Sequence, residues 1–158
     1  MESSSQYCLP AVSDARARVT DLALVEHSHS IVAGASDGSV HVCRVDLTQS
    51  NTGSSASQTG NEKYKVSGTS DVKRMNRSEG EILAVSHFNS LSSSMVVFAT
   101  QRGNVHGWDL RTEKDSFVLR QAPDLGYMTC MALGHDKNWM VSGTSRGFLC
   151  LWDVRFQK

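Results

Sequence analysis

The chain has 158 residues, and its 16 Lys and Arg balance 16 Asp and Glu, so its formal net charge is +0. This balance provides no overall field for nucleic acid or anionic lipid, and we expect neither nucleic-acid binding nor direct membrane binding. No apolar run approaches the roughly 20 residues that span a bilayer, and the polar start from Met1 to Ser5 does not predict a secretory signal.

Three segments of the chain share one pattern. Each has a first strand, a second strand that runs to a glycine in a tight turn, and a third strand that ends at a Trp-Asp position. The predicted first strands are 19–25, 81–87 and 128–133, and the turn glycines are Gly38, Gly103 and Gly147. A fourth strand is predicted at 116–121 and, on weaker grounds, at 63–66.

The spacing of the turn glycines predicts the fold class. Gly147 follows Gly103 by 44 residues, which matches one β-propeller blade of about 40–45 residues. Gly103 follows Gly38 by 65 residues, and the polar run 48–61 accounts for the excess as a disordered insertion. The chain is therefore predicted to be all-β, with about three four-stranded antiparallel blades of a partial WD40-type propeller.

We divide the chain on this basis. The parts are an N-terminal segment that could supply an outer strand of a preceding blade (1–18), a degenerate blade (19–47), the insertion (48–62), an outer strand and linker (63–79), a blade (80–122) and an incomplete blade (123–158). Because three blades do not close a ring and each blade contacts only its neighbours, we expect marginal stability in isolation.

The Trp-Asp dipeptides are Trp108-Asp109 and Trp152-Asp153, and their predicted role is structural. WD repeats often join this Trp to a Ser or Thr, a turn Asp and a His. Thr100 and Thr144 match the Ser/Thr place, and Asp37 matches the Asp place in the first repeat only. No repeat has every member, so we expect these blades to rely on packing.

The remaining motifs favour structure over chemistry. Gly34–Gly38 and Gly143–Gly147 match the G-x-S-x-G pattern of hydrolases, but both fall at the same turn of the repeat, and no helix is predicted after either serine. The histidines and the four cysteines (Cys8, Cys43, Cys130 and Cys150) show no metal-site spacing. We expect no catalytic residues, no metal and no cofactor.

One family resemblance covers about 18–157. It is carried by His87-Phe88-Asn89, by Gly107–Arg111 and by Trp152–Gln157. In this order they resemble the WD region of the regulatory subunit of class III phosphatidylinositol 3-kinase, the vacuolar protein sorting pseudokinase–HEAT–WD family. The resemblance implies a non-catalytic scaffold in autophagy and endosomal sorting, with the lipid kinase catalytic subunit and a Beclin-type subunit as partners. It also implies a cytoplasmic location, peripheral on endosomal and autophagic membranes. The family's kinase-like domain has no counterpart in this chain.

Alternative functions stay open. Both Trp-Asp dipeptides continue as W-D-x-R, with Arg111 and Arg155 as possible partner contacts, and this pattern resembles the one by which some WD-repeat substrate receptors dock onto cullin-RING ubiquitin ligases. A phosphoinositide-binding propeller is less favoured, because an F-R-R-G-type motif is missing. A hydrolase that uses Ser36 and Ser145 is the least favoured reading.

Overall fold

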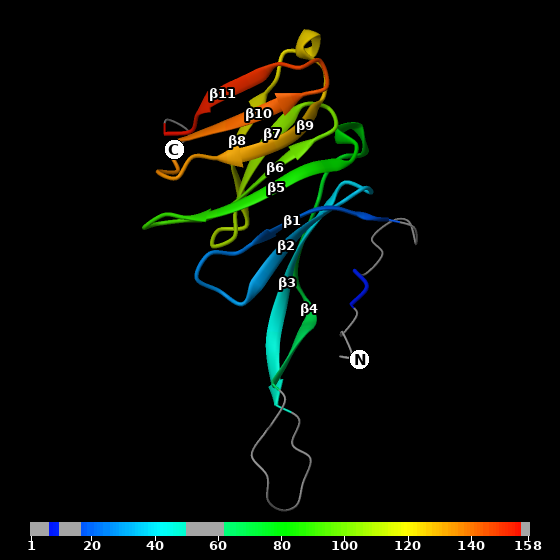
Figure 1. The fold of residues 1–158 in the computed structure, drawn as a ribbon, viewed down its shortest axis with the longest axis vertical. Helices are drawn as coiled ribbons and strands as arrows, with labels where there is room; N and C mark the ends of the chain where they lie inside the picture. Colours follow the sequence, from blue (N-terminus) through cyan, green and yellow to red (C-terminus); the bar gives the residue numbers. More distant parts are fainter. Residues whose placement is uncertain (1–6, 10–16, 50–61, 156–158) are drawn as a thin grey trace, which may run out of the picture.

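The computed structural model describes residues 7–9, 17–49 and 62–155, and most of them lie in antiparallel sheets. The predicted all-β, partial propeller is confirmed. Figure 1 shows the three sheets stacked one beside the next in chain order, as blades are. The described part of the chain contains no apolar helix of the length needed to cross a bilayer.

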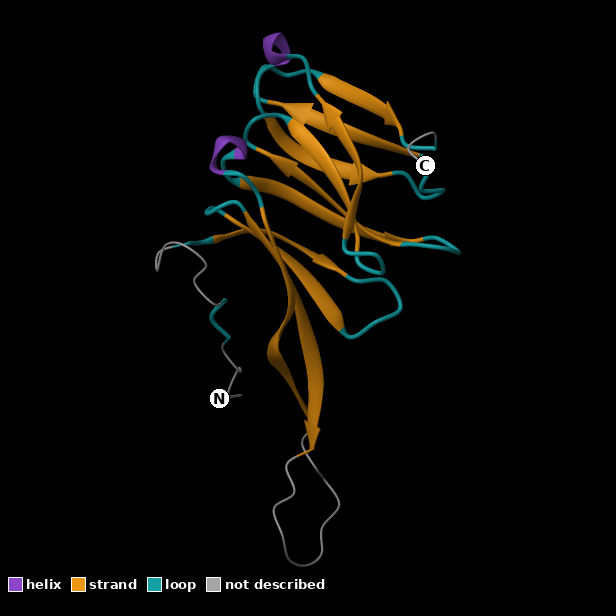
Figure 2. Cartoon of the chain, turned by 180° about the vertical axis from the view of Figure 1, so that it is seen from behind, coloured by secondary structure: helices purple, strands orange, loops and turns teal. Residues whose placement is uncertain are grey.

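The first blade has the strand order β1-β2-β3-β4. Its strands are β1 (Val19–Leu24), β2 (Ser30–Ala35), β3 (Ser39–Gln49) and β4 (Glu62–Arg74). β3 and β4 form a long ribbon that extends away from the other blades (Figures 1 and 2). β4 is much longer than the four residues expected at 63–66, and β3 includes Thr48 and Gln49, which we had placed in the insertion. The rest of the predicted disordered loop, 50–61, lies outside the described residues.

The second and third blades follow the same plan. The second has the order β5-β6-β7-β8 and the third has the order β11-β10-β9, so the described third blade has three strands. Their strands are β5 (Ile82–Asn89), β6 (Ser94–Thr100), β7 (Asn104–Asp109), β8 (Lys114–Arg120), β9 (Met128–Leu133), β10 (Trp139–Thr144) and β11 (Leu149–Asp153). Short 3-10 helices, η1 (Arg77–Glu79) and η2 (Pro123–Leu125), precede the second and third blades.

Two apolar cores lie between the sheets. In each strand successive side chains point to opposite faces, so one face of the second blade packs on the first blade and the other packs on the third. The first core joins residues such as Val32 and Val42 to Val96, Phe98 and Trp108. The second core, which includes Val97, Val105, Phe117, Met128 and Met140, joins the second blade to the third.

The two ends of the stack differ in the turns they carry. One end, called the turn end below, holds the β2–β3, β6–β7 and β10–β11 turns, with Gly38, Gly103 and Gly147 at φ values of 81°, 91° and 83°. The opposite end, the WD end, holds the Trp-Asp dipeptides and the β1–β2, β5–β6 and β9–β10 turns. The two ends therefore present different sets of loops to a partner.

Within the N-terminal segment 1–18, residues 7–9 and 17–18 are described, and neither stretch has strand structure. The hydroxyl of Tyr7 lies 3.3 Å from Thr69 Oγ1 on β4, so residues 7–9 lie beside the first blade. The outer strand of a preceding blade that the sequence offers for 1–18 is not seen in the described part of that segment.

Candidate functional site

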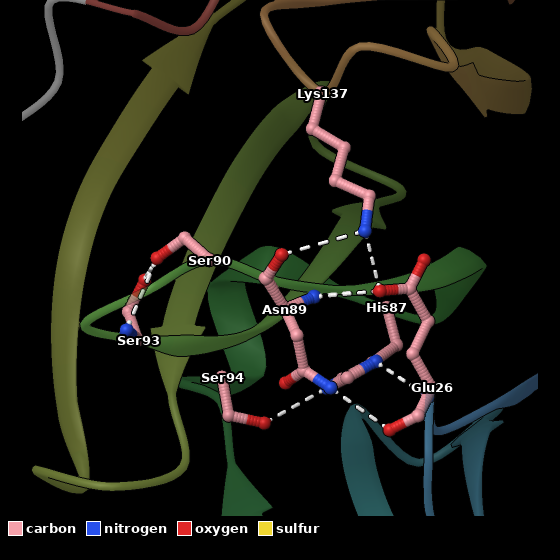
Figure 3. A network of polar contacts seen from close by, with 7 residues as sticks. All are labelled: Glu26, His87, Asn89, Ser90, Ser93, Ser94 and Lys137. Carbon is pink, nitrogen blue, oxygen red and sulfur yellow. Dashed lines mark hydrogen bonds and ion pairs between the residues drawn. The ribbon is translucent and has the colours of Figure 1, made fainter.

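A polar cluster at the WD end connects all three blades, and we call its members Glu26, His87, Asn89 and Lys137 the clasp (Figure 3). Lys137, in the β9–β10 turn, donates from Nζ to Glu26 Oε2 over 2.5 Å and to the Asn89 carbonyl over 3.4 Å. Asn89 donates from its backbone N to Glu26 Oε2 (2.9 Å) and from Nδ2 to the Glu26 carbonyl (2.8 Å). One carboxylate of the first blade thus bonds to both other blades.

His87 completes the clasp beneath the β1–β2 turn. The backbone N of Glu26 donates to His87 Nδ1 (3.0 Å), so Nε2 carries the ring proton and donates to Ser94 Oγ (2.9 Å). Burial lowers the pKa of the His87 imidazole. The nearby Glu26 carboxylate acts to raise this pKa, and the positive charge of Lys137 acts to lower it. The neutral imidazole is the form that fits, since a proton on Nδ1 would meet the Glu26 N–H.

The clasp explains the first of the three motifs that carried the family resemblance. His87 and Asn89 are the two polar residues of the His87-Phe88-Asn89 motif, and Phe88 packs against the second core. Lys137 lowers the pKa of the Glu26 carboxyl through its hydrogen bond, and the Asn89 amide acts in the same direction. The sequence did not point to Glu26 or Lys137, because they lie in polar turns far apart along the chain.

The two WD tryptophans lie between blades. Trp108 is buried in the first core, and the Lys73 ammonium lies 5.5 Å from its ring centroid. Lys73 also pairs with Asp115 (2.5 Å), which ties the outer strands of the first two blades together. Trp152 packs against the second core and donates from Nε1 to Ser142 Oγ (2.9 Å).

The acceptor for Trp152 differs from the one we expected. Thr144 was placed at the Ser/Thr position, but its hydroxyl accepts from the Phe148 backbone N (3.2 Å). Ser142, ten residues before the tryptophan and directly opposite Cys150, is the residue whose side chain shares the tryptophan's face. Thr100 likewise serves another partner and donates to Glu79 Oε2 (2.8 Å).

Each of the first two blades has a substitute polar network near the turn end. In the first, Asp37 Oδ1 accepts from both the backbone N and the hydroxyl of Ser39, and that hydroxyl lies 2.8 Å from His41 Nε2. Side-chain hydrogen bonds therefore stabilise these blades together with apolar packing, whereas the sequence predicts packing alone.

The network of the second blade is built on Glu79 of η1. Its carboxylate accepts from Thr100 and from Asn104 Nδ2 (3.0 Å), and it lies 3.6 Å from His106 Nε2. These hydrogen bonds lower the pKa of Glu79 even though burial acts to raise it. Burial lowers the pKa of His106, whose ring stacks on Phe98 with centroids 5.2 Å apart. His106 and His41 occupy the same place in their repeats.

Asp109 and Asp153 close the turns that follow the WD dipeptides. Asp109 Oδ1 accepts from the backbone N of Ser94 and of Arg111. Asp153 forms an ion pair with Arg155, which raises the pKa of Arg155 and lowers that of Asp153. Arg111 Nη1 lies 3.5 Å from the Leu91 carbonyl. A partner contact through Arg111 or Arg155 stays a prediction.

The two G-x-S-x-G serines make the same contact in their blades. Ser36 donates from its backbone N to the Arg18 carbonyl and accepts the Arg18 N–H on Oγ, both over 3.0 Å. Ser145 does the same with Tyr127, over 2.9 and 3.2 Å. Both hydroxyls thus fasten the chain just before the first strand of a blade. In the described ranges, the His, Cys, Asp and Glu side chains form no cluster that could hold a metal ion.

Comparison with known proteins gives a consistent family. No family model matches the chain. It is 41% identical over 140 residues to the probable serine/threonine-protein kinase vps15 of Dictyostelium discoideum, covering 88% of this chain and 7% of that protein. It is 36% identical over 136 residues to the serine/threonine-protein kinase VPS15 of Arabidopsis thaliana, covering 85% and 9%. The putative VPS15 kinase of Komagataella pastoris is 25% identical over 146 residues, covering 88% and 10%. The chain thus spans a tenth or less of the length of these relatives.

Proposed function

The chain belongs to the VPS15 family, whose members it matches over a small all-β part, and from this premise we propose that it is a non-catalytic protein-interaction scaffold. Its proposed setting is the class III phosphatidylinositol 3-kinase complex in autophagy and endosomal sorting. The proposed partners are the lipid kinase catalytic subunit and a Beclin-type subunit. The proposed location is cytoplasmic, peripheral on endosomal and autophagic membranes through the complex.

The observation that carries the scaffold role is the pair of outward faces of the stack. On the first blade, Leu22 and Leu24 point away from the first core and are 58% and 78% exposed. On the third blade, Leu149 and Leu151 point away from the second core and are 81% and 74% exposed. Neighbouring exposed leucines on one strand face are typical of surfaces that pack on further protein, and we propose that a partner covers them.

The local structure also supports a role without catalysis. The serines that match a hydrolase pattern are engaged in fastening each blade, in equivalent positions of two repeats. The buried histidines lie in networks that hold turns and blade junctions together. Their chemistry is used by the fold itself, which favours a scaffold over an enzyme.

Co-purification tests the proposal. A tagged chain is co-expressed with the class III lipid kinase catalytic subunit and a Beclin-type subunit, and we expect both to be recovered with it. The double variant Leu149→Asp with Leu151→Asp should lose them, because it places two carboxylates in the apolar outward face. The matched control is Leu91→Asp in the β5–β6 turn, since Leu91 is fully exposed and away from that face.

Equal recovery of both subunits with the double variant and with the control contradicts the proposed role of the outward face. Failure of the wild-type chain to recover either subunit contradicts the proposed complex. Circular dichroism of each variant checks that the sheets remain folded.

A further inference from the structure

The turn end of the stack gathers arginine side chains. Six of the nine arginines in the described ranges lie there, and all six are exposed: Arg18, Arg74, Arg77, Arg102, Arg120 and Arg146. The pairing of strands fixes their place, because Arg74 lies opposite Ser39 and Arg120 lies opposite Asn104, at the first residue of β3 and of β7. Acidic residues also occur at this end, but two of them are engaged within the fold, Asp37 by Ser39 and Glu79 by Thr100 and Asn104.

Part of this end combines arginine with exposed aromatic rings. Tyr127 and Phe148 are 56% and 50% exposed, and they flank the β10–β11 turn that carries Arg146. Tyr127 donates from its backbone N to Ser145 Oγ, next to Arg146. Tyrosine and arginine are the residue types most often found at the energetic centres of protein interfaces.

Hydrogen bonds join the β6–β7 turn to the segment between β8 and β9, and this segment in turn bonds to the β10–β11 turn. The Gln121 backbone N donates to the Gly103 carbonyl (3.0 Å), and its Nε2 donates to the Gly126 carbonyl (2.6 Å). A Cβ built on Gly126 would lie 3.0 Å from Arg146 Cγ, so the Arg146 side chain lies directly against this loop. The residues Arg102, Arg120, Tyr127, Arg146 and Phe148, called the arginine–aromatic surface, are therefore neighbours on adjoining blades.

The guanidinium groups of this surface are presented outward. Arg146 Nη1 donates to the Asp124 carbonyl (2.7 Å), which holds the guanidinium group in place. The remaining N–H donors of the group are available to a partner. Among the described residues, Arg102 and Arg120 have no side-chain hydrogen bond or ion pair. Arginine presents a planar fork of donors that matches a carboxylate in two parallel hydrogen bonds.

We propose that the arginine–aromatic surface is a docking site for an acidic segment of a partner protein, with apolar residues that pack on Tyr127 and Phe148. This inference rests on the proposed scaffold role and names the chemistry of one of its partners. A protein segment fits better than a lipid surface, because the carboxylates of Glu81 and Asp124 lie among the arginines. They weaken the long-range field that attracts a membrane, whereas pairwise contacts can still form.

Binding of a synthetic peptide tests this site directly. The probe is a fluorescein-labelled peptide of repeated Asp-Asp-Leu units, titrated with the full purified chain and followed by fluorescence anisotropy. We expect saturable binding that weakens as salt rises. The double variant Arg102→Glu with Arg146→Glu should lower the affinity roughly tenfold or more, because two attractive contacts become repulsive. A second pair, Arg102→Glu with Arg120→Glu, removes no hydrogen bond described in the fold and should act in the same direction.

The matched control is Arg44→Glu with Lys114→Glu, which changes the net charge equally but away from the turn end. It should leave the affinity within about twofold of wild type, since exposed charges at a distance are screened. An Asn-Asn-Leu peptide and phosphatidylserine vesicles should not bind. Equal losses in the control and turn-end variants, tighter binding to the vesicles, or no binding of the acidic peptide would overturn the proposal. Peptide binding is read independently of subunit recovery, so a failure here is distinct from a failure of the proposed complex.

Discussion

The ammonium of Lys137 in the third blade lies 2.5 Å from the carboxylate of Glu26 in the first, although 111 residues separate them in the chain. The bond passes beside Asn89 of the second blade, which donates to the same carboxylate oxygen. Repeat proteins usually gain stability from contacts between adjacent units. Here one ion pair joins the first unit to the third, so the angle between blades is held by a contact that spans the whole stack.

Substitution of Lys137 by Met should destabilise the chain. Both charged groups are about a third exposed, so we expect a modest loss of about 1 kcal/mol in the free energy of unfolding. Urea unfolding followed by circular dichroism measures this loss. The comparison variant is Arg44→Met, which breaks an exposed pair with Asp46 inside the first blade. A similar loss in both variants would show that the Lys137–Glu26 pair contributes no more to the free energy of unfolding than an exposed ion pair within one blade.

Acidification should destabilise the chain from near-neutral pH downward. Burial lowers the pKa of His41, His87 and His106 from the ordinary value of 6.5. Between that value and the lower folded values, the unfolded chain binds more protons than the folded one, so the free energy of unfolding falls as the pH drops below about 6.5. Urea midpoints measured over this range give the slope.

The substitution His87→Asn should make the dependence of the free energy of unfolding on pH shallower. Asn cannot titrate, and its amide can keep one of the two hydrogen bonds that His87 makes to Glu26 and Ser94. The variant His29→Asn changes an exposed histidine and serves as its control. Stability that is constant or rises on acidification to about pH 5 contradicts the assignment of neutral buried histidines.

The Trp152–Ser142 hydrogen bond can be isolated by a double-mutant cycle. Trp152→Phe and Ser142→Ala each remove the bond between Nε1 and Oγ, and Ser142 is fully buried. We expect Ser142→Ala to cost about 1 kcal/mol and to cost markedly less when Phe already stands at 152. Thr144→Ala, two residues along the same strand, should show no such coupling to Trp152. Coupling through Thr144 instead of Ser142 would restore the assignment first made from the sequence.

Gly147→Ala should reveal the strain of the β10–β11 turn with little interference from packing. Gly147 has a φ of 83°, and a Cβ built there meets no atom within 4 Å. The cost therefore comes from the backbone alone, at about 1 to 2 kcal/mol. Asn tolerates this region better, so Gly147→Asn should recover part of the loss in a thermal melt. An alanine variant as stable as wild type is incompatible with the left-handed turn.

Much of the fold could be predicted because the repeat leaves a strong local signal. Turn glycines such as Gly103 and Gly147 stand at blade spacing, and alternating apolar residues mark the strands on either side. The length of β4 could not be predicted in this way. Its sequence from Ser67 to Asp71 is polar, because an outer strand with an exposed face needs no apolar alternation.

The polar networks were the harder part to predict. No repeat carries the full set of usual WD residues at their fixed places, so the sequence predicts that packing alone holds the blades. The structure instead brings Glu79 from a 3-10 helix to Thr100 and Asn104, and brings Lys137 to Glu26. Such pairs depend on how blades stack, which local patterns do not encode. The ten-residue spacing from Ser142 to Trp152 was available in the sequence and could have identified that pair.

Hydrogen–deuterium exchange with the partner present tests the scaffold role most directly. The chain is measured alone and with the purified class III lipid kinase catalytic subunit, and exchange is compared strand by strand. We predict slower exchange in complex over β11 and the β10–β11 turn, where Leu149, Leu151 and Phe148 are exposed. The inner strands β6 and β7 of the second blade, which are buried on both faces, should change little. Exchange that is the same with and without the catalytic subunit in every strand would contradict the account.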